Sequence, residues 1–324
     1  MELPGSICTR RMFSLMTALL LFAQIGHAQG VAAAGAEGQQ TAIPLWTGAA
    51  PGALGTAPED TPMLIPLLPA RQRTSTAVLV IPGGGYAHLS LPTEGVEIAQ
   101  ALNAAGIPAF VLAYRLGPRY RYPAQLLDAQ RAVRFIRARG GRFQVRRVGV
   151  MGFSAGGHLA AMLGTSAAAG DPSAADPLER ESARPDFMML GYPVITNAGW
   201  AAEGSLRNID PDTSHAVISM KPEMPAIPPM SQDSLRKLSV DLHVSAETPP
   251  AFLVCANDDT SVSAENSALF YLALKRAGVQ AELHIFAHGR HGFGLAAWDP
   301  VDRAWMPMFL DWLRSNDWLE PLKK

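Results

Sequence analysis

Short, almost continuously apolar runs alternate with longer amphipathic runs along most of this chain, and this alternation restricts the fold more than any other feature. Six runs have the length and composition of buried strands: residues 77–81, 108–114, 148–151, 187–190, 251–255 and 283–286. Strands that are apolar at nearly every position are covered on both faces. Helical patterns separate them, at about 93–105, 124–139, 155–168, 264–277 and 301–315. This order predicts a doubly wound, mostly parallel α/β sheet with helices on both faces.

The helical pattern at 124–139 indicates how its helix packs. The apolar residues fall on one stripe: Ala129, Ala132, Val133 and Ile136. The charged residues lie mostly on the other side: Asp128, Arg131, Arg134 and Arg137. An amphipathic helix of this kind is expected to rest on the sheet with its apolar stripe.

The first 28 residues have the layout of a secretory signal peptide. The basic pair Arg10 and Arg11 precedes an apolar run from Met12 to Ile25, and the small residues Gly26 and Ala28 precede a cleavage site. Such a run is short for a membrane span, so we expect no stable membrane insertion of the mature chain. The segment "TRRMF" also resembles a twin-arginine signal, so the ordinary secretory route and the twin-arginine route both stay open. We expect the protein to be exported, to the periplasm or outside the cell.

After the predicted signal peptide we expect a flexible spacer over residues 29–45 and one α/β domain over residues 46–324. Residues 195–249 interrupt the alternation with a stretch that includes "MKPEMPAIPPM" and has little periodicity. Connections of this length are uncommon and are usually binding loops or lids. A surface excursion without a function is the alternative.

Charge and cysteine content exclude several classes of protein. The 27 Lys and Arg residues nearly balance 28 Asp and Glu residues, so nothing electrostatic favours a nucleic-acid partner. Only Cys255 remains after removal of the predicted signal, which excludes an internal disulfide. Its apolar surroundings, "AFLVCA", predict a buried and unreactive thiol. No Cys/His cluster has the spacing of a structural zinc site.

The pentapeptide "GFSAG" places Ser154 between an apolar strand and a helix. Gly152 and Gly156 either allow a sharp turn and nothing more, or they expose Ser154 as a nucleophile, as in the G-x-S-x-G elbow. The free N–H groups at the start of the helix would favour negative charge beside the serine.

A serine nucleophile needs a base and a carboxylate, and both occur downstream at strand ends. The strand 251–255 is followed by "NDDTSV", with Asp258 and Asp259, and the strand 283–286 by "AHGRHGFGL", with His288 and His291. Functional groups gather at the carboxyl ends of such sheets. A single Asp or His in a loop says little, but three suitable residues at three strand ends predict a triad.

A glycine-rich loop supplies the last catalytic element. "IPGGGYAH" directly follows the strand 77–81, and successive glycines let backbone N–H groups point inward. Gly84, Gly85 and the N–H of Ala155 are the predicted oxyanion-hole donors. A flexible loop or phosphate cradle is the alternative, but the Lys-Ser/Thr ending of a P-loop is missing.

With these motifs in place, residues 75–315 resemble bacterial esterases of the α/β-hydrolase superfamily, most of all the acetylxylan and carbohydrate acetylesterases. The segments that carry the resemblance are "PGGGY", "YRLGPRYRYPAQLLDAQRAVRFIR", "VGVMGFSAGGHLAA", "TPPAFLVCANDDTSV" and "HIFAHGRHGFGL". The resemblance is specific for the family and only suggestive for the substrate.

The resemblance implies a nucleophile at Ser154 and a general base at His291. The family's acid lies three residues before a valine, which selects Asp259, three before Val262, over Asp258. Arg290 stands where glycine is more usual, a change that leaves the triad intact.

Other family features occur here with small changes. Pro82 takes the place of the histidine in the H-G-G-G loop of esterases and lipases, and no proline follows Val262. His158 is typical of the family and is expected to be structural. Tyr86 is expected to line the substrate site.

Together these features predict a serine esterase that removes acetyl or another short acyl group from a small-molecule or oligosaccharide ester, such as a plant polysaccharide fragment. No metal and no organic cofactor is needed for this two-step chemistry. A prolyl-oligopeptidase-like peptidase shares the elbow and the triad order. The short stretch between the predicted signal and the first predicted strand argues against the upstream propeller domain of such enzymes, and a short aminopeptidase-like form stays open. A catalytically silent binding protein of the same fold is the third alternative. The identity of the ester and the oligomeric state cannot be read from the sequence.

Overall fold

A computed structural model of the chain describes residues 41–166, 169–196, 203–212, 230–299, 302–319 and 321–322. All of them belong to one compact unit, Gly38–Lys324. The predicted signal peptide, 1–28, and residues 29–40 of the predicted spacer lie outside the described residues.

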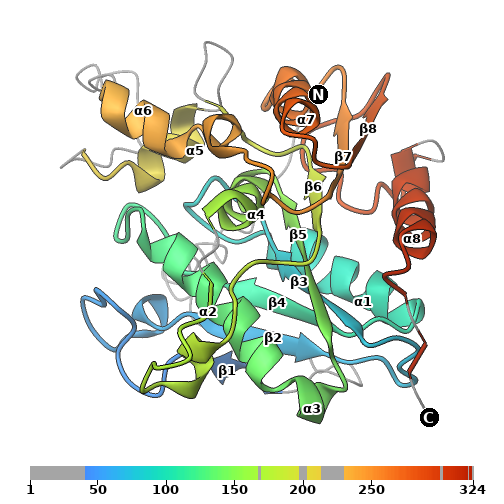
Figure 1. The fold of residues 1–324 in the computed structure, drawn as a ribbon. Helices are drawn as coiled ribbons and strands as arrows, with labels where there is room; N and C mark the ends of the chain where they lie inside the picture. The colour runs from blue at the N-terminus through green and yellow to red at the C-terminus, as the bar shows by residue number, and fades with distance from the viewer. Residues whose placement is uncertain are drawn as a thin grey trace, which may run out of the picture. The chain divides into compact units, whose positions relative to one another are not determined.

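Strands and helices alternate along the described chain (Figure 1). The strands are β1 (Ile43–Pro44), β2 (Met63–Leu67), β3 (Thr76–Ile81), β4 (Ala109–Ala113), β5 (Arg147–Phe153), β6 (Met188–Gly191), β7 (Ala251–Ala256) and β8 (Ala281–Phe286). The α-helices are α1 (Glu97–Ala104), α2 (Ala124–Ala138), α3 (Gly140–Phe143), α4 (Ala155–Ser166), α5 (Glu203–Ile209), α6 (Gln232–Leu238), α7 (Glu265–Arg276) and α8 (Trp305–Ser315). A π-helical turn, Leu91–Val96, leads into α1, and a 3-10 turn, Asp302–Ala304, leads into α8.

The strands form an eight-stranded sheet in the order β1-β2-β4-β3-β5-β6-β7-β8. The pairs β1–β2 and β2–β4 are antiparallel, whereas every pair from β4 to β8 is parallel. The prediction of a doubly wound, mostly parallel sheet is therefore confirmed. The carboxyl ends of β3, β5, β7 and β8 meet at one edge of the sheet, where ligands of such folds bind.

The two N-terminal strands were not predicted. β1 has two residues and lies within the stretch that the sequence indicates as a spacer. β2 contains Pro66, which cannot donate a hydrogen bond to a neighbouring strand. Among the described strands, β1 pairs only with Met63 and Leu64, so no other strand needs a hydrogen bond from Pro66 at that edge of β2.

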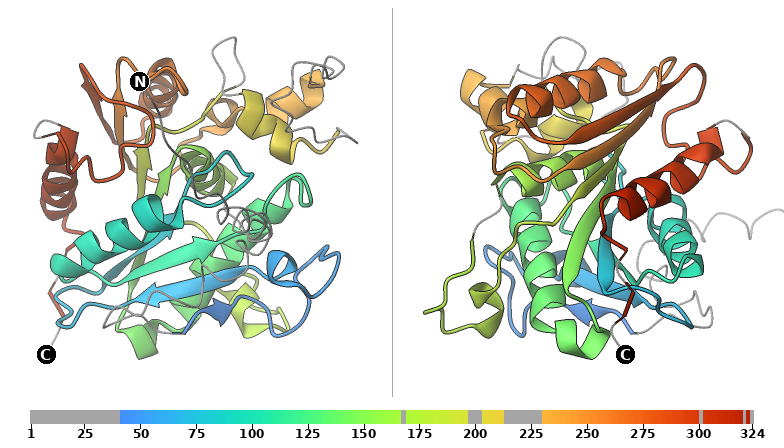
Figure 2. Two further views of the ribbon diagram at one scale, coloured as in Figure 1. Left: turned by 180° about the vertical axis from the view of Figure 1, so that it is seen from behind. Right: turned by 45° about the vertical axis from the view of Figure 1, so that its right-hand side comes forward.

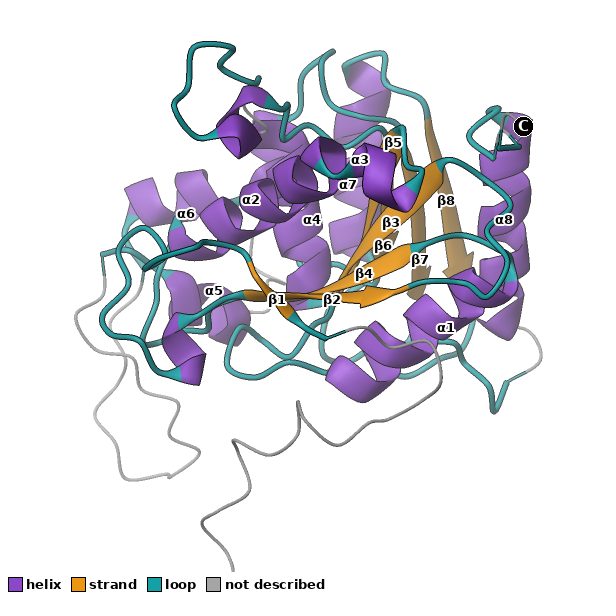
Figure 3. Ribbon diagram, turned by 90° about the horizontal axis from the view of Figure 1, so that it is seen from below, coloured by secondary structure: helices purple, strands orange, loops and turns teal. Residues whose placement is uncertain are grey.

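Helices cover both faces of the sheet (Figures 2 and 3). Strand β3 shows why the strands of this sheet are apolar at nearly every position. Ala77, Leu79 and Ile81 pack into one core with α2, α4 and α7, whereas Val78 and Val80 pack into the other with α1 and α8. Successive strand residues point to opposite faces, so a strand covered twice needs apolar side chains at every position.

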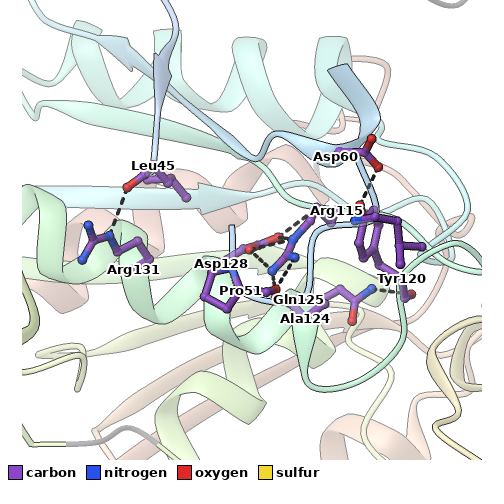
Figure 4. Close-up of polar contacts among 10 residues, drawn as sticks. Leu45, Pro51, Asp60, Arg115, Tyr120, Ala124, Gln125, Asp128 and Arg131 are labelled. Atoms are coloured by element: carbon purple, nitrogen blue, oxygen red, sulfur yellow. Dashed lines mark hydrogen bonds and ion pairs between the residues drawn. The ribbon is translucent and has the colours of Figure 1, made fainter. Parts of the chain in front are cut away.

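The charged side of α2 is less exposed than its periodicity predicts. Asp128 is buried because Arg115, also buried, reaches it with Nη2–Oδ1 at 2.7 Å and Nε–Oδ2 at 3.0 Å (Figure 4). Arg131 is buried too, and its Nε donates to the carbonyl oxygen of Leu45. Arg131 thus binds the chain's first described segment to the helix directly, and Asp128 does so through Arg115, whose Nη1 donates to the carbonyl oxygen of Pro51. A helical wheel cannot reveal either role.

The segment predicted as an excursion or lid, 195–249, contains α5, α6 and a 3-10 turn, Val240–His243, in its described parts. Residues 197–202 and 213–229 lie outside them. In the part of the chain that is described, none of the helices has both the length and the apolar character needed to span a membrane.

Candidate active site

Ser154 sits in a strained turn between β5 and α4, with a left-handed backbone (φ 52°) that non-glycine residues rarely adopt. A Cβ at Gly152 would lie 2.2 Å from the carbonyl oxygen of Gly156, and a Cβ at Gly156 would lie 2.2 Å from that of Ile81. Both glycines are therefore required for strand, turn and helix to pack this closely. The turn has the geometry of a nucleophile elbow.

Three side chains form one hydrogen-bonded chain at the carboxyl edge of the sheet. Ser154 Oγ lies 2.8 Å from His291 Nε2, and His291 Nδ1 lies 2.7 Å from Asp259 Oδ2. The Asp259 side chain is almost completely buried, whereas 23% of the His291 side chain is exposed. The residues predicted from three separate strand ends thus meet, while their catalytic roles stay predictions.

The acid loop after β7 distinguishes its two aspartates. Asp259 Oδ1 accepts hydrogen bonds from the backbone N–H groups of residues 261–262, at 2.8 and 3.0 Å, which orients Oδ2 toward the histidine. Asp258 is half exposed and accepts from the N–H of Gly289 at 2.7 Å and contacts His288 Nδ1 at 3.2 Å. Asp258 therefore joins the acid loop to the histidine loop and does not reach His291.

The glycine-rich loop after β3 lies directly against the elbow. Gly84 and Gly85 have φ angles of 120° and 62°, and a Cβ at Gly84 would lie 2.2 Å from the carbonyl oxygen of His88. A Cβ at Gly83 would lie 2.9 Å from Ser154 Cβ. Glycine is needed at Gly83 because a Cβ there would push the loop away from the serine, and at Gly84 and Gly85 because their φ angles disfavour any side chain.

The carbonyl groups of this loop are bonded to its surroundings. Their donors are Ser90 N for Gly83, Ala87 N for Gly84 and Asn208 Nδ2 for Gly85. Among the described residues, no partner is found for the N–H groups of Gly84, Gly85 or Ala155. These are the three N–H groups predicted as oxyanion-hole donors, and donors aimed at a developing oxyanion are what acyl transfer needs.

Tyr86 is placed differently from the prediction. Its side chain has no exposed surface, and its hydroxyl lies 2.8 Å from Nδ1 of the equally buried His158. Tyr86 therefore supports the glycine-rich loop from behind and does not line the substrate site. His158 Nε2 lies 2.7 Å from the carbonyl oxygen of Leu238, so this histidine joins the loop, α4 and the end of α6, in keeping with the structural role expected for it.

His158 should make the protein less stable in mild acid. Its Nε2 must donate to the Leu238 carbonyl, so Nδ1 is free of hydrogen and accepts from Tyr86. Burial lowers the pKa of His158 to about 4, although the bond to Leu238 acts in the other direction. The unfolded chain binds this proton near pH 6.5, so the free energy of unfolding falls as the pH drops from about 6.5 to about 4, by at most about 1.4 kcal/mol per pH unit.

The measurement is chemical unfolding of the wild type and of His158→Gln between pH 7.5 and 4. The variant should be less stable at pH 7.5, and its loss of stability with falling pH should be shallower. Parallel pH curves for the two chains would contradict the assignment.

Two buried residues beside the site were not predicted, Glu94 and Tyr192. Glu94 Oε2 accepts from the N–H of Gly83 at 2.8 Å, and Tyr192 follows β6 at the same edge of the sheet as Ser154. The strand-end position of Tyr192 was a signal that sequence reasoning passed over. Glu94 lies in a π-helical turn that the sequence indicates only as the start of a helix. Within the described residues, no three His, Cys, Asp or Glu side chains are grouped to hold a metal ion.

Comparison with known proteins identifies the family. The model of the BD-FAE family matches residues 65–274, about two thirds of the chain. The chain belongs to this family. BD-FAE is an α/β-hydrolase family, and the matched stretch includes Ser154 and Asp259 but ends before His291.

Individual relatives of this BD-FAE chain are esterases and xylan-degrading enzymes. It is 32% identical over 245 residues to an acetylxylan esterase of Xylanibacter ruminicola, covering 74% of this chain and 45% of the relative. It is 32% identical over 229 residues to endo-1,4-beta-xylanase B of Butyrivibrio fibrisolvens, covering 68% of this chain and 32% of the relative. The chain thus spans less than half the length of these two curated relatives.

A solved structure covers more of the fold. The acetyl ester-xyloside bifunctional hydrolase of Caldicellulosiruptor lactoaceticus is 39% identical, with a TM-score of 0.76 over 86% of this chain and 97% of that chain. The likeness extends over nearly the whole of that enzyme.

Proposed function

We propose that this BD-FAE chain is a serine esterase that hydrolyses carboxylic esters through an acyl-enzyme on Ser154. The observation that supports it most is the continuous chain of hydrogen bonds from Ser154 through His291 to Asp259, beside a loop in which the N–H groups of Gly84 and Gly85 have no partner among the described residues. Esterases among its relatives and structural neighbours support the same class of reaction.

The hydrogen bonds define where the protons are. The Asp259 carboxylate only accepts, so Nδ1 of His291 carries the hydrogen and Nε2 accepts from the Ser154 hydroxyl. When Ser154 Oγ attacks the ester carbonyl carbon, Nε2 takes the hydroxyl proton. The buried negative charge of Asp259 then stabilises the imidazolium.

The remaining steps use the same groups. The carbonyl oxygen becomes an oxyanion, and the N–H groups of Gly84, Gly85 and Ala155 donate to it. The intermediate collapses as the alcohol leaves with the proton from Nε2, and Ser154 holds the acyl group. Water, deprotonated by His291, attacks the acyl-enzyme, and the acid is released with Ser154 restored.

For the substrate we propose acetyl or other short acyl esters of oligosaccharides, which the kinship to an acetylxylan esterase and an acetyl ester-xyloside hydrolase supports. We also propose that the chain is exported, to the periplasm or beyond. The layout of its first 28 residues supports this location, with the ordinary secretory and twin-arginine routes both open.

A substrate panel tests the proposal. The purified chain is given a chromogenic acetate ester, acetylated xylo-oligosaccharides, feruloyl esters and Pro-containing peptide amides, and the released acid or amine is measured for each. We expect the acetyl esters to be hydrolysed fastest. Cleavage of the peptide amides alone would favour a peptidase, and no hydrolysis of any ester would overturn the esterase proposal.

A further inference from the structure

Glu94 places a buried carboxylate directly behind the glycine-rich loop. Only 3% of this residue is exposed. Its Oε2 accepts from the N–H of Gly83 at 2.8 Å, and a Cβ on Gly83 would lie 2.7 Å from Oε2 and 2.9 Å from Ser154 Cβ. Gly83 therefore separates the Glu94 carboxylate from the nucleophile, and the carboxylate is bonded directly to the glycine-rich loop. The proposed reaction does not use this carboxylate.

The other carboxylate oxygen connects to the histidine loop. Glu94 Oε1 accepts from the hydroxyl of Tyr192 at 2.9 Å, and this hydroxyl accepts from the N–H of Gly294 at 3.0 Å. The Tyr192 ring is buried and meets the His291 ring edge-on, with ring centroids 5.1 Å apart. Tyr192 also has a strained left-handed backbone (φ 36°), and such strain persists only where the surroundings fix it.

The bonds fit one protonation state. The Tyr192 oxygen takes the Gly294 hydrogen and donates its own to Glu94, so both Glu94 oxygens act as acceptors. A carboxylate satisfies every group, whereas a carboxylic acid would add a hydrogen with no acceptor. Burial raises the pKa of Glu94, and the hydrogen bonds from Tyr192 and Gly83 oppose that rise.

We propose that Glu94 and Tyr192 are positioning residues for the proposed ester hydrolysis. They form a bridge between the glycine-rich loop and the loop after β8 that carries His291, and this bridge keeps both loops in position beside Ser154. The inference rests on the proposed function, since it assigns the bridge to that same site. Neither residue touches the reacting atoms. The bridge acts through Gly83, which precedes the donors Gly84 and Gly85, and through Gly294, which follows His291.

Two nearly isosteric variants break the bridge at different points. Tyr192→Phe removes one oxygen and leaves the Gly294 N–H without its partner. Glu94→Gln keeps an acceptor for Gly83, but its NH₂ group would face a hydroxyl that already accepts from Gly294. Displacing a catalytic group by about 1 Å costs about 100-fold in rate, so we expect each variant to acylate Ser154 about 10- to 100-fold more slowly.

The experiment measures acylation of Ser154 by a small fluorophosphonate reagent in the full chain. The rate at saturating reagent (kinact) should fall in each single variant, while the half-saturating concentration stays unchanged, because the bridge positions groups and does not bind the reagent. The double variant should be no slower than the slower single variant, since both changes break one unit.

Tyr120→Phe is a matched control. Tyr120 is buried, and its hydroxyl donates to the carboxylate of Asp60 (Figure 4). The same hydroxyl accepts from the backbone N–H of Leu54, so its two bonds are of the same kinds as those of Tyr192. It contacts neither the triad nor the glycine-rich loop through any hydrogen bond found in the described residues. We expect it to lower the unfolding temperature as Tyr192→Phe does and to leave kinact unchanged.

Three results would overturn the bridge: an unchanged kinact in either single variant, multiplied losses in the double variant, or an equal loss in Tyr120→Phe. The proposed function fails separately. If the reagent labels Ser154 but the chain hydrolyses no ester, the esterase proposal is overturned. The kinact values of the variants can still be compared in that case, so the bridge remains testable. A wild-type chain whose Ser154 is not labelled would overturn both.

Discussion

Replacing Ser154 with alanine should reduce ester hydrolysis by about a million-fold, the order of loss that follows removal of a serine nucleophile. Without Oγ no acyl-enzyme forms, and His291 Nε2, 2.8 Å from that oxygen, has no proton to take. The initial rate on a chromogenic acetate ester measures the effect. Ser267→Ala, which removes a buried hydroxyl on α7, is the control and should keep its activity.

A pair of asparagine variants distinguishes the triad carboxylate, Asp259, from the neighbouring Asp258. Asp259→Asn should lower kcat by about 10⁴-fold, because an amide can donate to Nδ1 and fix the imidazole in the wrong tautomer. Asp258→Asn should cost far less, since the partners found for the Asp258 carboxylate in the described part of the chain are His288 and Gly289, not His291. Equal losses in the two asparagine variants, or activity that survives Ser154→Ala, would refute the assignment of the triad.

The site could be anticipated from the sequence because its residues follow strands. Apolar runs mark where parallel strands end, and those ends share one edge of the sheet, so Ser154, Asp259 and His291 could be assigned to one place without any contact being known. Their spacing in the chain is large, yet the fold class itself brings them together. Choosing Asp259 over Asp258 required the family pattern, and the structure shows the physical difference in the partners of the two carboxylates.

The supporting residues could not be found in this way, because their positions depend on what packs behind the loops. Tyr86 follows three glycines and looks like a side chain at the mouth of a pocket, but His158, 72 residues away, draws its hydroxyl into the core. Asp128 lies on the charged side of its helix and is nevertheless buried, since Arg115 comes from another segment. Periodicity describes one element at a time, whereas burial of a polar group is decided by its partner.

Arg115→Met should be among the most destabilising single substitutions in the described chain, with a loss of about 3–5 kcal/mol in the free energy of unfolding. Both side chains of the Arg115–Asp128 pair are fully buried, and Arg115 also donates to the carbonyl oxygen of Pro51 at 2.7 Å. Methionine fills a similar volume but leaves the Asp128 charge in the core without its cation. Urea unfolding at pH 7 measures the loss, and Arg314→Met, which removes an exposed ion pair with Asp311, should change stability by about 1 kcal/mol or less.

The double variant Arg115→Met/Asp128→Leu tests whether the uncompensated charge is the cause. Removing both charges should restore stability, since a buried pair contributes little more than apolar side chains of similar volume. The restoration should be incomplete, because Asp128 Oδ2 also accepts from the Arg115 backbone N–H at 2.9 Å, and a buried N–H without an acceptor costs about 1–3 kcal/mol. A double variant as unstable as Arg115→Met would instead assign the loss to the bonds that Arg115 makes to Pro51 and to Ala124, which hold the N-terminal segment against α2.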